Sequence, residues 1–401
     1  MVSSTLDRPQ SRSSGEMPIL DPVRTADIER KHGLVREFLG SHRYDALLLQ
    51  RPSNFAWFTA GADCVLSNAL GAAAALFITT DARVLVTTNA DSAQFFDYEV
   101  SSLGFQLKER PWHEPRHLLL DDLCRGRTVA GDGVYGNTDD ASLYVSRMRS
   151  PLTVLDCERL REVGRAVAHA VEATARHLRP GRTEAEVAGE LAHRLMKREI
   201  VPERIQVSGD GQRKRYRHWA YGTEPIERYC VISAIGRGGG LCAGASRTAS
   251  FGEPPSELRE AHQHVALLQA TGMHFSRADW EVYEVWNRVQ RIYEKFGHGD
   301  EWRLAPQAEV IGYEPSELAI VPRSEFQLGA RTAIHWHPSV GPAASGDTIL
   351  ITDRGPELLT PMENWPKLTV QIKGVELVRP DILRLDQMGE TGADSVLAMT
   401  E

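Results

Sequence analysis

The sequence predicts an α+β protein of two domains. Its 401 residues exceed what a single hydrophobic core usually holds. Residues 23–157 alternate short apolar runs with helical patterns, as an α/β domain does. Residues 158–385 show a pair of helices followed by strands, and then the same order again, which indicates a duplicated α-α-β-β domain. The duplication rests on this pattern alone, because the two halves share no recognisable sequence. Polar tails at 1–22 and 386–401 complete the chain, and we expect both to be flexible.

In the first domain, apolar runs bounded by turn residues predict buried strands at Ala46–Leu49, Ala73–Ile78, Val84–Thr88 and Thr128–Ala130. Helical patterns lie around them at Ile28–Leu39, Asp91–Tyr98, Pro115–Leu123 and Ala141–Met148. A last strand is predicted at Leu152–Asp156.

The second domain begins with an Ala-rich amphipathic helix, Arg159–Leu178, which ends before Pro180 and Gly181. Thr183 and Glu186 have the spacing of a capping box, so a second helix follows over 185–199. Strands are then expected at Arg204–Ser208, Arg228–Gly236 and Gly239–Phe251, and helices at Ser256–Met273 and Asp279–Phe296. The closing strands are expected at Ala308–Tyr313, Arg331–His337, Asp347–Thr352 and Glu357–Leu359.

The composition argues against several classes of protein. An apolar fraction of 42% with 25% charged residues is ordinary for a globular protein in water. The net charge of -8 argues against a nucleic-acid partner, and no run approaches the roughly 20 apolar residues of a membrane helix. The five cysteines are scattered without CxxC spacing, and the first 22 residues lack the apolar core of a signal peptide. We therefore expect a cytoplasmic protein with reduced thiols.

Several phrases of the sequence resemble peptidase family M24, which includes aminopeptidase P, prolidase, methionine aminopeptidase and creatinase. K-x-G-L-V-R-E-F-L, Y-D-A-L-L-L and N-F-A-W-F-T-A-G are similar to the N-terminal domain of creatinase and prolidase. The catalytic domain of the family is resembled by R-P-G-R-T-E-A-E-V at 179–187 and S-R-T-A-S-F-G at 246–252. The phrase at 346–360 is the most specific, because it fits the family's E-D-T-x-L-V-T-x-x-G-x-E-x-L-T nearly end to end. The resemblance covers about Arg24 to Leu385 and implies a creatinase-like N-terminal domain, a pita-bread catalytic-type domain and a homodimer.

Family members hold two divalent metals with two Asp, one His and two Glu, and the register of these motifs finds none of the five ligands here. The five ligand positions fall on Ser233, Gly244, Glu309, His337 and Gly346, and a second family histidine falls on Ser316. Gly297-His298-Gly299 repeats the G-H-G of the metal motif, but it directly follows a helix, so we interpret it as a helix-terminating turn. The resemblance therefore predicts a divergent member with no metal and no other cofactor.

The remaining polar groups can still move protons. Creatinase hydrolyses a C–N bond without metal, with a pocket histidine as base, and His218 stands at the matching place. His335 and His337 alternate along one strand and share a face, so both would join His218 as catalytic residues if that face is the pocket. If the face points outward, Trp336 would be the buried neighbour. Glu309 is a further acid/base candidate.

A second group of residues is predicted to bind the substrate. Its members are Arg217, Tyr221, Ser233, Arg247, Tyr313 and Glu317. Arg217 ends the basic run 213–217, which would attract a carboxylate or phosphate unless it is a solvated loop. Arg247, in S-R-T, would alternatively brace the sheet.

Two functions from different classes remain open. The first is a metal-independent hydrolase that cleaves an amide- or amidine-type C–N bond of a small polar metabolite, or a cyclase or lyase with the same pocket. The second is a non-catalytic pita-bread module that binds a peptide, a protein or a metabolite. Glu309 and His337 stand where metal ligands were lost, and both can transfer protons, which favours the enzyme.

Overall fold

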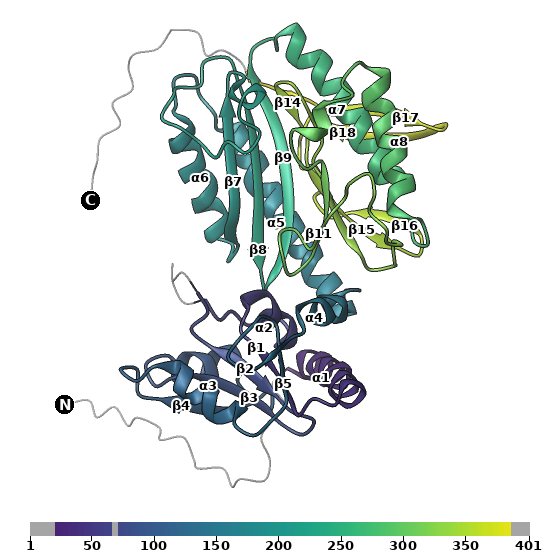
Figure 1. Ribbon diagram of the computed structural model, residues 1–401. Helices are drawn as coiled ribbons and strands as arrows, with labels where there is room; N and C mark the ends of the chain where they lie inside the picture. Colours follow the sequence, from purple (N-terminus) through teal and green to yellow (C-terminus); the bar gives the residue numbers. More distant parts are fainter. Residues whose placement is uncertain (1–20, 66–70, 386–401) are drawn as a thin grey trace, which may run out of the picture. The chain divides into compact units, whose positions relative to one another are not determined.

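The computed structural model describes residues 21–65 and 71–385, and the chain divides after Leu155 into two compact units (Figure 1). The predicted tails lie outside the described residues, apart from residues 21 and 22. Asp21 caps the first helix, because its side chain accepts a hydrogen bond from the backbone N–H of Arg24. No helix within the described ranges is long and apolar enough to cross a membrane.

The first unit is built on a six-stranded mixed sheet in the order β4-β3-β2-β1-β5-β6. Its strands are β1 (Ala46–Leu49), β2 (Ala75–Ile78), β3 (Arg83–Thr88), β4 (Gln106–Arg110), β5 (Val129–Gly131) and β6 (Asp139–Asp140). Its helical segments are α1 (Pro22–His42), α2 (Pro52–Phe58), the π-helical η1 (Gln94–Glu99), α3 (Arg116–Cys124) and α4 (Ser142–Arg149).

Most predicted elements of this unit are confirmed, and the exceptions have local causes. β1 is buried at every position, so its residues form a continuous apolar run from which the strand could be predicted. Strand β4 was missed because its residues are largely exposed and polar. The strand predicted at Leu152–Asp156 is wrong: helix α5 (Val154–Arg176) begins inside it. A short apolar run does not distinguish a buried strand from the first turn of a buried helix.

The second unit begins with helices α5 and α6 (Glu184–Met196), which flank a four-stranded sheet in the order β19-β9-β8-β7 (Figure 1). Its strands are β7 (Val201–Gly209), β8 (Tyr229–Gly238), β9 (Leu241–Phe251) and β19 (Leu383–Leu385). The predicted capping box at Thr183 and Glu186 is confirmed. A Cβ on Gly236 of β8 would lie 2.8 Å from Val167 of α5 and 3.6 Å from Leu195 of α6. The two helices therefore pack directly on this sheet.

The same order then repeats with α7 (Ser256–Phe275), α8 (Val282–Lys295) and a five-stranded sheet in the order β11-β10-β12-β15-β16. The strands are β10 (Ala308–Ile311), β11 (Leu318–Ala319), β12 (Ala333–Trp336), β15 (Asp347–Thr352) and β16 (Gly355–Leu358). Two hairpins add β13 (Ser339–Val340) with β14 (Ala343–Ala344), and β17 (Lys367–Ile372) with β18 (Val375–Pro380). Gly297, at φ +74°, follows the end of α8, so the G-H-G sequence is a helix-terminating turn as predicted.

Strand β12 divides its side chains between the core and the site. Ile334 and Trp336 belong to the core formed with α7 and α8, and a Cβ on Gly272 of α7 would lie 2.5 Å from the Trp336 ring. Because side chains alternate along a strand, His335 faces the opposite side of the sheet. There it approaches the hairpin of β8 and β9.

Candidate functional site

The pairing of the strands brings the five expected ligand positions together. In the β8–β9 hairpin, Ser233 pairs with Ser246, and two residues further along Ile235 pairs with Gly244. A bridge joins Ser246 to Gly346, at the start of β15. Glu309 of β10 pairs with His335 of β12. The register of the motifs therefore converges on one place in the second unit.

A small cavity lies at this place. Its wall includes Arg204, Gln206, Arg213, Ser233, His335 and His337. The interior has a volume of about 10 Å³, which is room for one water molecule. With its mouth, which opens to solvent, the cavity reaches about 300 Å³. The interior alone is therefore too small for a small-molecule ligand, which would have to lie largely in the mouth.

His335 fills the space that metal ligands would need. A Cβ on Gly244 would lie 2.7 Å from Cε1 and Nε2 of the His335 ring, and a Cβ on Gly346 would lie 3.2 Å from its Cε1. The ring is buried and stacks on His337, with centroids 4.8 Å apart and planes at 21°. Its Nδ1 lies 3.3 Å from the hydroxyl of Thr348, which also bonds to both backbone groups of Gly244.

These residues do not fit a pair of divalent metals. Of the five ligand positions only Glu309 carries a carboxylate, and hard divalent ions require several oxygen ligands. The guanidinium groups of Arg204 and Arg213 at the cavity wall would also repel a cation. Among the described residues, no group of three or more His, Cys, Asp or Glu side chains is placed to hold a metal ion.

Glu309 and His337 form the ionisable pair of the site. Oε1 of Glu309 lies 3.4 Å from Nε2 of His337 and 3.3 Å from Nη2 of Arg204. Burial alone would raise the pKa of Glu309, but the neighbouring His337, His335 and Arg204 lower it to about 2. Burial lowers the pKa of His337, against the effect of the Glu309 carboxylate, so the imidazole is neutral beside an ionised Glu309 at neutral pH. Burial and the charge of His337 keep the pKa of His335 well below its usual value.

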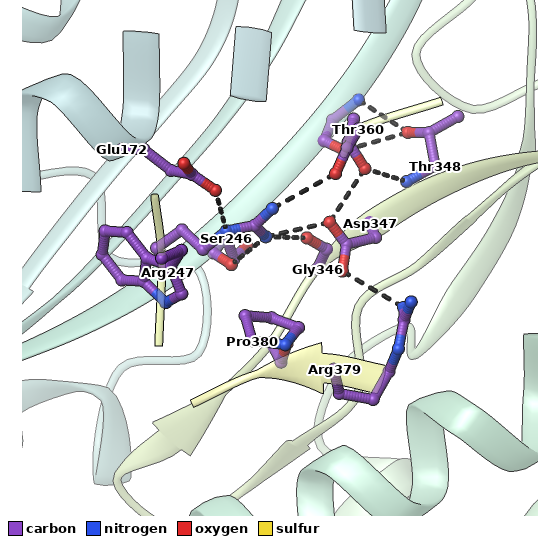
Figure 2. Close-up of polar contacts among 12 residues, drawn as sticks. Glu172, Ser246, Arg247, Gly346, Asp347, Thr348, Thr360, Arg379 and Pro380 are labelled. Atoms are coloured by element: carbon purple, nitrogen blue, oxygen red, sulfur yellow. Dashed lines mark hydrogen bonds and ion pairs between the residues drawn. The ribbon is translucent and has the colours of Figure 1, made fainter. Parts of the chain in front are cut away.

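Arg247, predicted to bind substrate or to brace the sheet, does not line the cavity. Its side chain is fully buried on the face of β9 opposite Ser246. Nε donates to Glu172 of α5 at 3.0 Å, and Nη1 donates to Asp347 of β15 at 2.9 Å (Figure 2). Backbone carbonyls, including that of Thr360, accept its remaining protons. The alternative prediction, that Arg247 braces the sheet, matches these contacts.

Two further predicted binding residues are also held by structural contacts. The Tyr313 hydroxyl is buried and donates to Oδ1 of Asp156 at 2.6 Å. Arg217 pairs with Glu301 at 2.7 Å and donates to the carbonyl of Gly341. Neither side chain lines the cavity.

Tyr221 and Glu317 lie outside the cavity wall. Tyr221 is exposed, and Oε1 of Glu317 accepts a hydrogen bond from the backbone N–H of Glu314 at 3.0 Å. Ser316, at the second histidine position of the family, is exposed. Ser233 is the one member of the predicted binding group that lines the cavity.

His218 lies apart from the other two predicted catalytic histidines. It is exposed and lines a second cavity of about 460 Å³, together with Trp286, Trp302 and Leu304. Within the described residues, no hydrogen bond or ion pair joins His218 to Glu309, His335 or His337. The structure thus brings together two of the three histidines.

Sequence reasoning missed Arg204 and Gln206. Both belong to β7, two residues apart, so they share the face that lines the cavity. The available signal was a charged residue at the start of a predicted strand of a largely buried sheet. Such a residue calls for a partner, and Glu309 is that partner.

Comparison with known proteins agrees with this fold. The model of metallopeptidase family M24 matches residues 158–352. The chain is similar to the dipeptidase PepE from Mycobacterium ulcerans, with 17% identity, a TM-score of 0.70, and coverage of 84% of this chain and 97% of that one. A prolidase from Pyrococcus horikoshii OT3 gives 18% identity and a TM-score of 0.71, over 83% of this chain and 99% of that one.

An Xaa-Pro dipeptidase from Bacillus anthracis is similar over 84% of this chain and 98% of its own, with 19% identity and a TM-score of 0.69. At these identities the structures show a shared fold. No curated protein sequence matches this chain significantly. Residues 158–352 therefore form a domain of metallopeptidase family M24.

Proposed function

We propose that this chain is a hydrolase that cleaves a C–N bond of a small polar metabolite without a metal pair, with His337 and Glu309 as its acid/base pair. The observation that carries the proposal is the contact of a neutral imidazole with an ionised, buried carboxylate beside a water-sized space. Two groups whose surroundings hold them in different protonation states are suited to acid/base work.

The proposal gives each of the two groups a role. In this proposal the proton of the neutral His337 ring lies on Nε2, 3.4 Å from the Glu309 carboxylate, and the lone pair lies on Nδ1. Nδ1 takes a proton from water while the water oxygen attacks the carbon of the C–N bond. The same proton then passes to the leaving nitrogen as the bond breaks. Glu309 stabilises the imidazolium that exists between these two steps.

The relatives support the type of bond. Their printed names describe dipeptidases and prolidases, which hydrolyse a C–N bond on the same fold. Their identity to this chain is below 20%, so the chemistry of this chain is argued from its own site residues. His218 has no part in this scheme, because it lies in the other cavity.

The test is hydrolysis of a panel of small amides, amidines and Xaa-Pro dipeptides, measured by amine release. We expect activity that is unchanged by EDTA and falls by about 10²- to 10⁴-fold in His337→Asn, the range for loss of a general base. Arg215→Gln is a matched control, because Arg215 is exposed and does not line the cavity. Activity that depends on added manganese, or that survives in His337→Asn, would contradict the proposal.

The small interior of the cavity favours a second candidate, a non-catalytic binding module. About 10 Å³ leaves no room for a substrate unless the reacting bond lies in the mouth. The panel separates the two candidates, since a binding module shows no turnover that His337→Asn removes.

A further inference from the structure

We propose that this cavity binds a small monoanionic carboxylate between Arg213 and Arg204. The binding site itself depends only on these side chains and not on the proposed hydrolysis. That the carboxylate belongs to a substrate rests on the proposed function.

Arg213 is a buried cation without a partner. Only 7% of the residue is exposed, and it lines the cavity. Its Nε is buried without a hydrogen bond, and its side chain forms no hydrogen bond or ion pair with any described residue. Burial, together with the charges of Arg217 and Arg204, lowers its pKa to about 10, so it remains protonated at neutral pH. A buried charge is costly unless an opposite charge and hydrogen bonds compensate it, which indicates an anion.

The neighbouring cations do have partners. Arg217 pairs with Glu301 at 2.7 Å, and Arg204 lies 3.3 Å from Glu309. Among the residues that the structure describes, these three guanidinium groups face two carboxylates, so one positive charge remains uncompensated, and the unpaired group is Arg213. The histidines of the site add no charge at neutral pH because their pKa values are lowered.

The arrangement favours a carboxylate over a phosphate. One uncompensated charge matches a monoanion, whereas a dianion would add repulsion from the ionised Glu309 beside Arg204. A planar carboxylate also matches the planar fork of a guanidinium, which can donate two parallel hydrogen bonds to it. Arg204 is partly exposed, with 38% of its side chain accessible, so it can donate to a ligand that enters from the mouth.

The experiment measures acetate binding to the full chain by saturation-transfer NMR and calorimetric titration, at constant ionic strength. We expect millimolar or tighter binding, weakened at least about tenfold in Arg213→Gln, because a hydrogen bond to a charged group is worth about 1.5–3 kcal/mol. The neighbouring Arg215→Gln is the matched control and should bind acetate as the unchanged chain does. Arg204→Gln, on a partly exposed strand residue, provides a second variant if Arg213→Gln fails to fold.

Each outcome decides the question. Equal acetate affinity of Arg213→Gln and the unchanged chain overturns the proposal, as does the absence of acetate binding. Inorganic phosphate that binds more tightly than acetate, and through Arg213, overturns the choice of a carboxylate. Hydrolysis is measured by amine release and acetate binding by titration, so failure of the proposed hydrolysis and failure of this site are seen in different measurements.

Discussion

The close fit between Gly244 and His335 gives the sharpest prediction. Gly244→Ala adds one Cβ that would lie 2.7 Å from two atoms of a buried ring and 3.0 Å from a third. The ring cannot move away easily, since His337 stacks on one face and the Thr348 hydroxyl lies beside Nδ1. Overpacking of this kind costs about 1–3 kcal/mol, and we expect the free energy of unfolding to fall by that amount.

The assay is urea denaturation of a double-mutant cycle that combines Gly244→Ala with His335→Ala. Removal of the ring opens the space, so the double variant should lose less stability than the sum of the two single changes, by at least about 1 kcal/mol. Gly189→Ala is the control: Gly189 lies exposed in α6, and an added Cβ would have no atom within 4 Å. It should gain roughly 0.5–1 kcal/mol from helix propensity. Additive losses, or a Gly244→Ala variant as stable as the unchanged chain, would refute the reasoning.

Three further predictions follow from the same contacts. Arg247→Met should cost about 3–5 kcal/mol in urea denaturation, because it removes the fully buried cation between Glu172 and Asp347, whose other ion-pair partners lie farther away, Arg176 at 3.5 Å and Arg379 at 3.4 Å. The exposed Arg354→Met should change stability by less than about 0.5 kcal/mol, and equal losses would contradict this. As pH falls below 6.5, His335 binds a proton in the unfolded chain but not in the folded chain, so the free energy of unfolding decreases. His335→Asn should flatten this decrease in denaturation curves taken between about pH 6.5 and 5, and an unchanged slope would count against the prediction. Gly346→Glu restores a carboxylate at a metal-ligand position of the family, yet it should destabilise the chain, because its Cβ would lie 2.6 Å from Oγ of Ser246. It should give no manganese-dependent rise in melting temperature, and such a rise would show that this site can hold a metal.

The sequence predicted the fold well because its elements carry strong local patterns. The capping box at Thr183 and the fully buried run of β1 are readable from neighbouring residues alone. The phrase at 346–360 gave the register of β15, and with it the position of Gly346 in the site. Elements with polar or ambiguous residues, such as β4 and the start of α5, were missed or misassigned because no local pattern distinguishes them.

The candidate site was predicted less completely because it depends on contacts between distant strands. Alternation along β12 showed that His335 and His337 share a face, but not that His218 lies in another cavity. Likewise, the sequence left Arg247 between two roles, and only its contacts with α5 and β15 decide between them. A metal does not fit because the His335 ring lies close to Gly244, and a sequence motif does not show such distances.

The ion-pair network of Arg247 has a consequence for how this protein can change. It joins α5, β9 and β15 through fully buried charges (Figure 2). The Arg247 side chain lies on the face of β9 opposite Ser246, which lines the cavity. The stability of the scaffold is therefore supplied by groups other than those that would perform chemistry. Evolution, or a laboratory selection, can replace residues of the cavity one after another while the chain stays above the threshold for folding. This separation lets the fold tolerate changes in the cavity, and it makes the chain a suitable host for newly designed reactive groups.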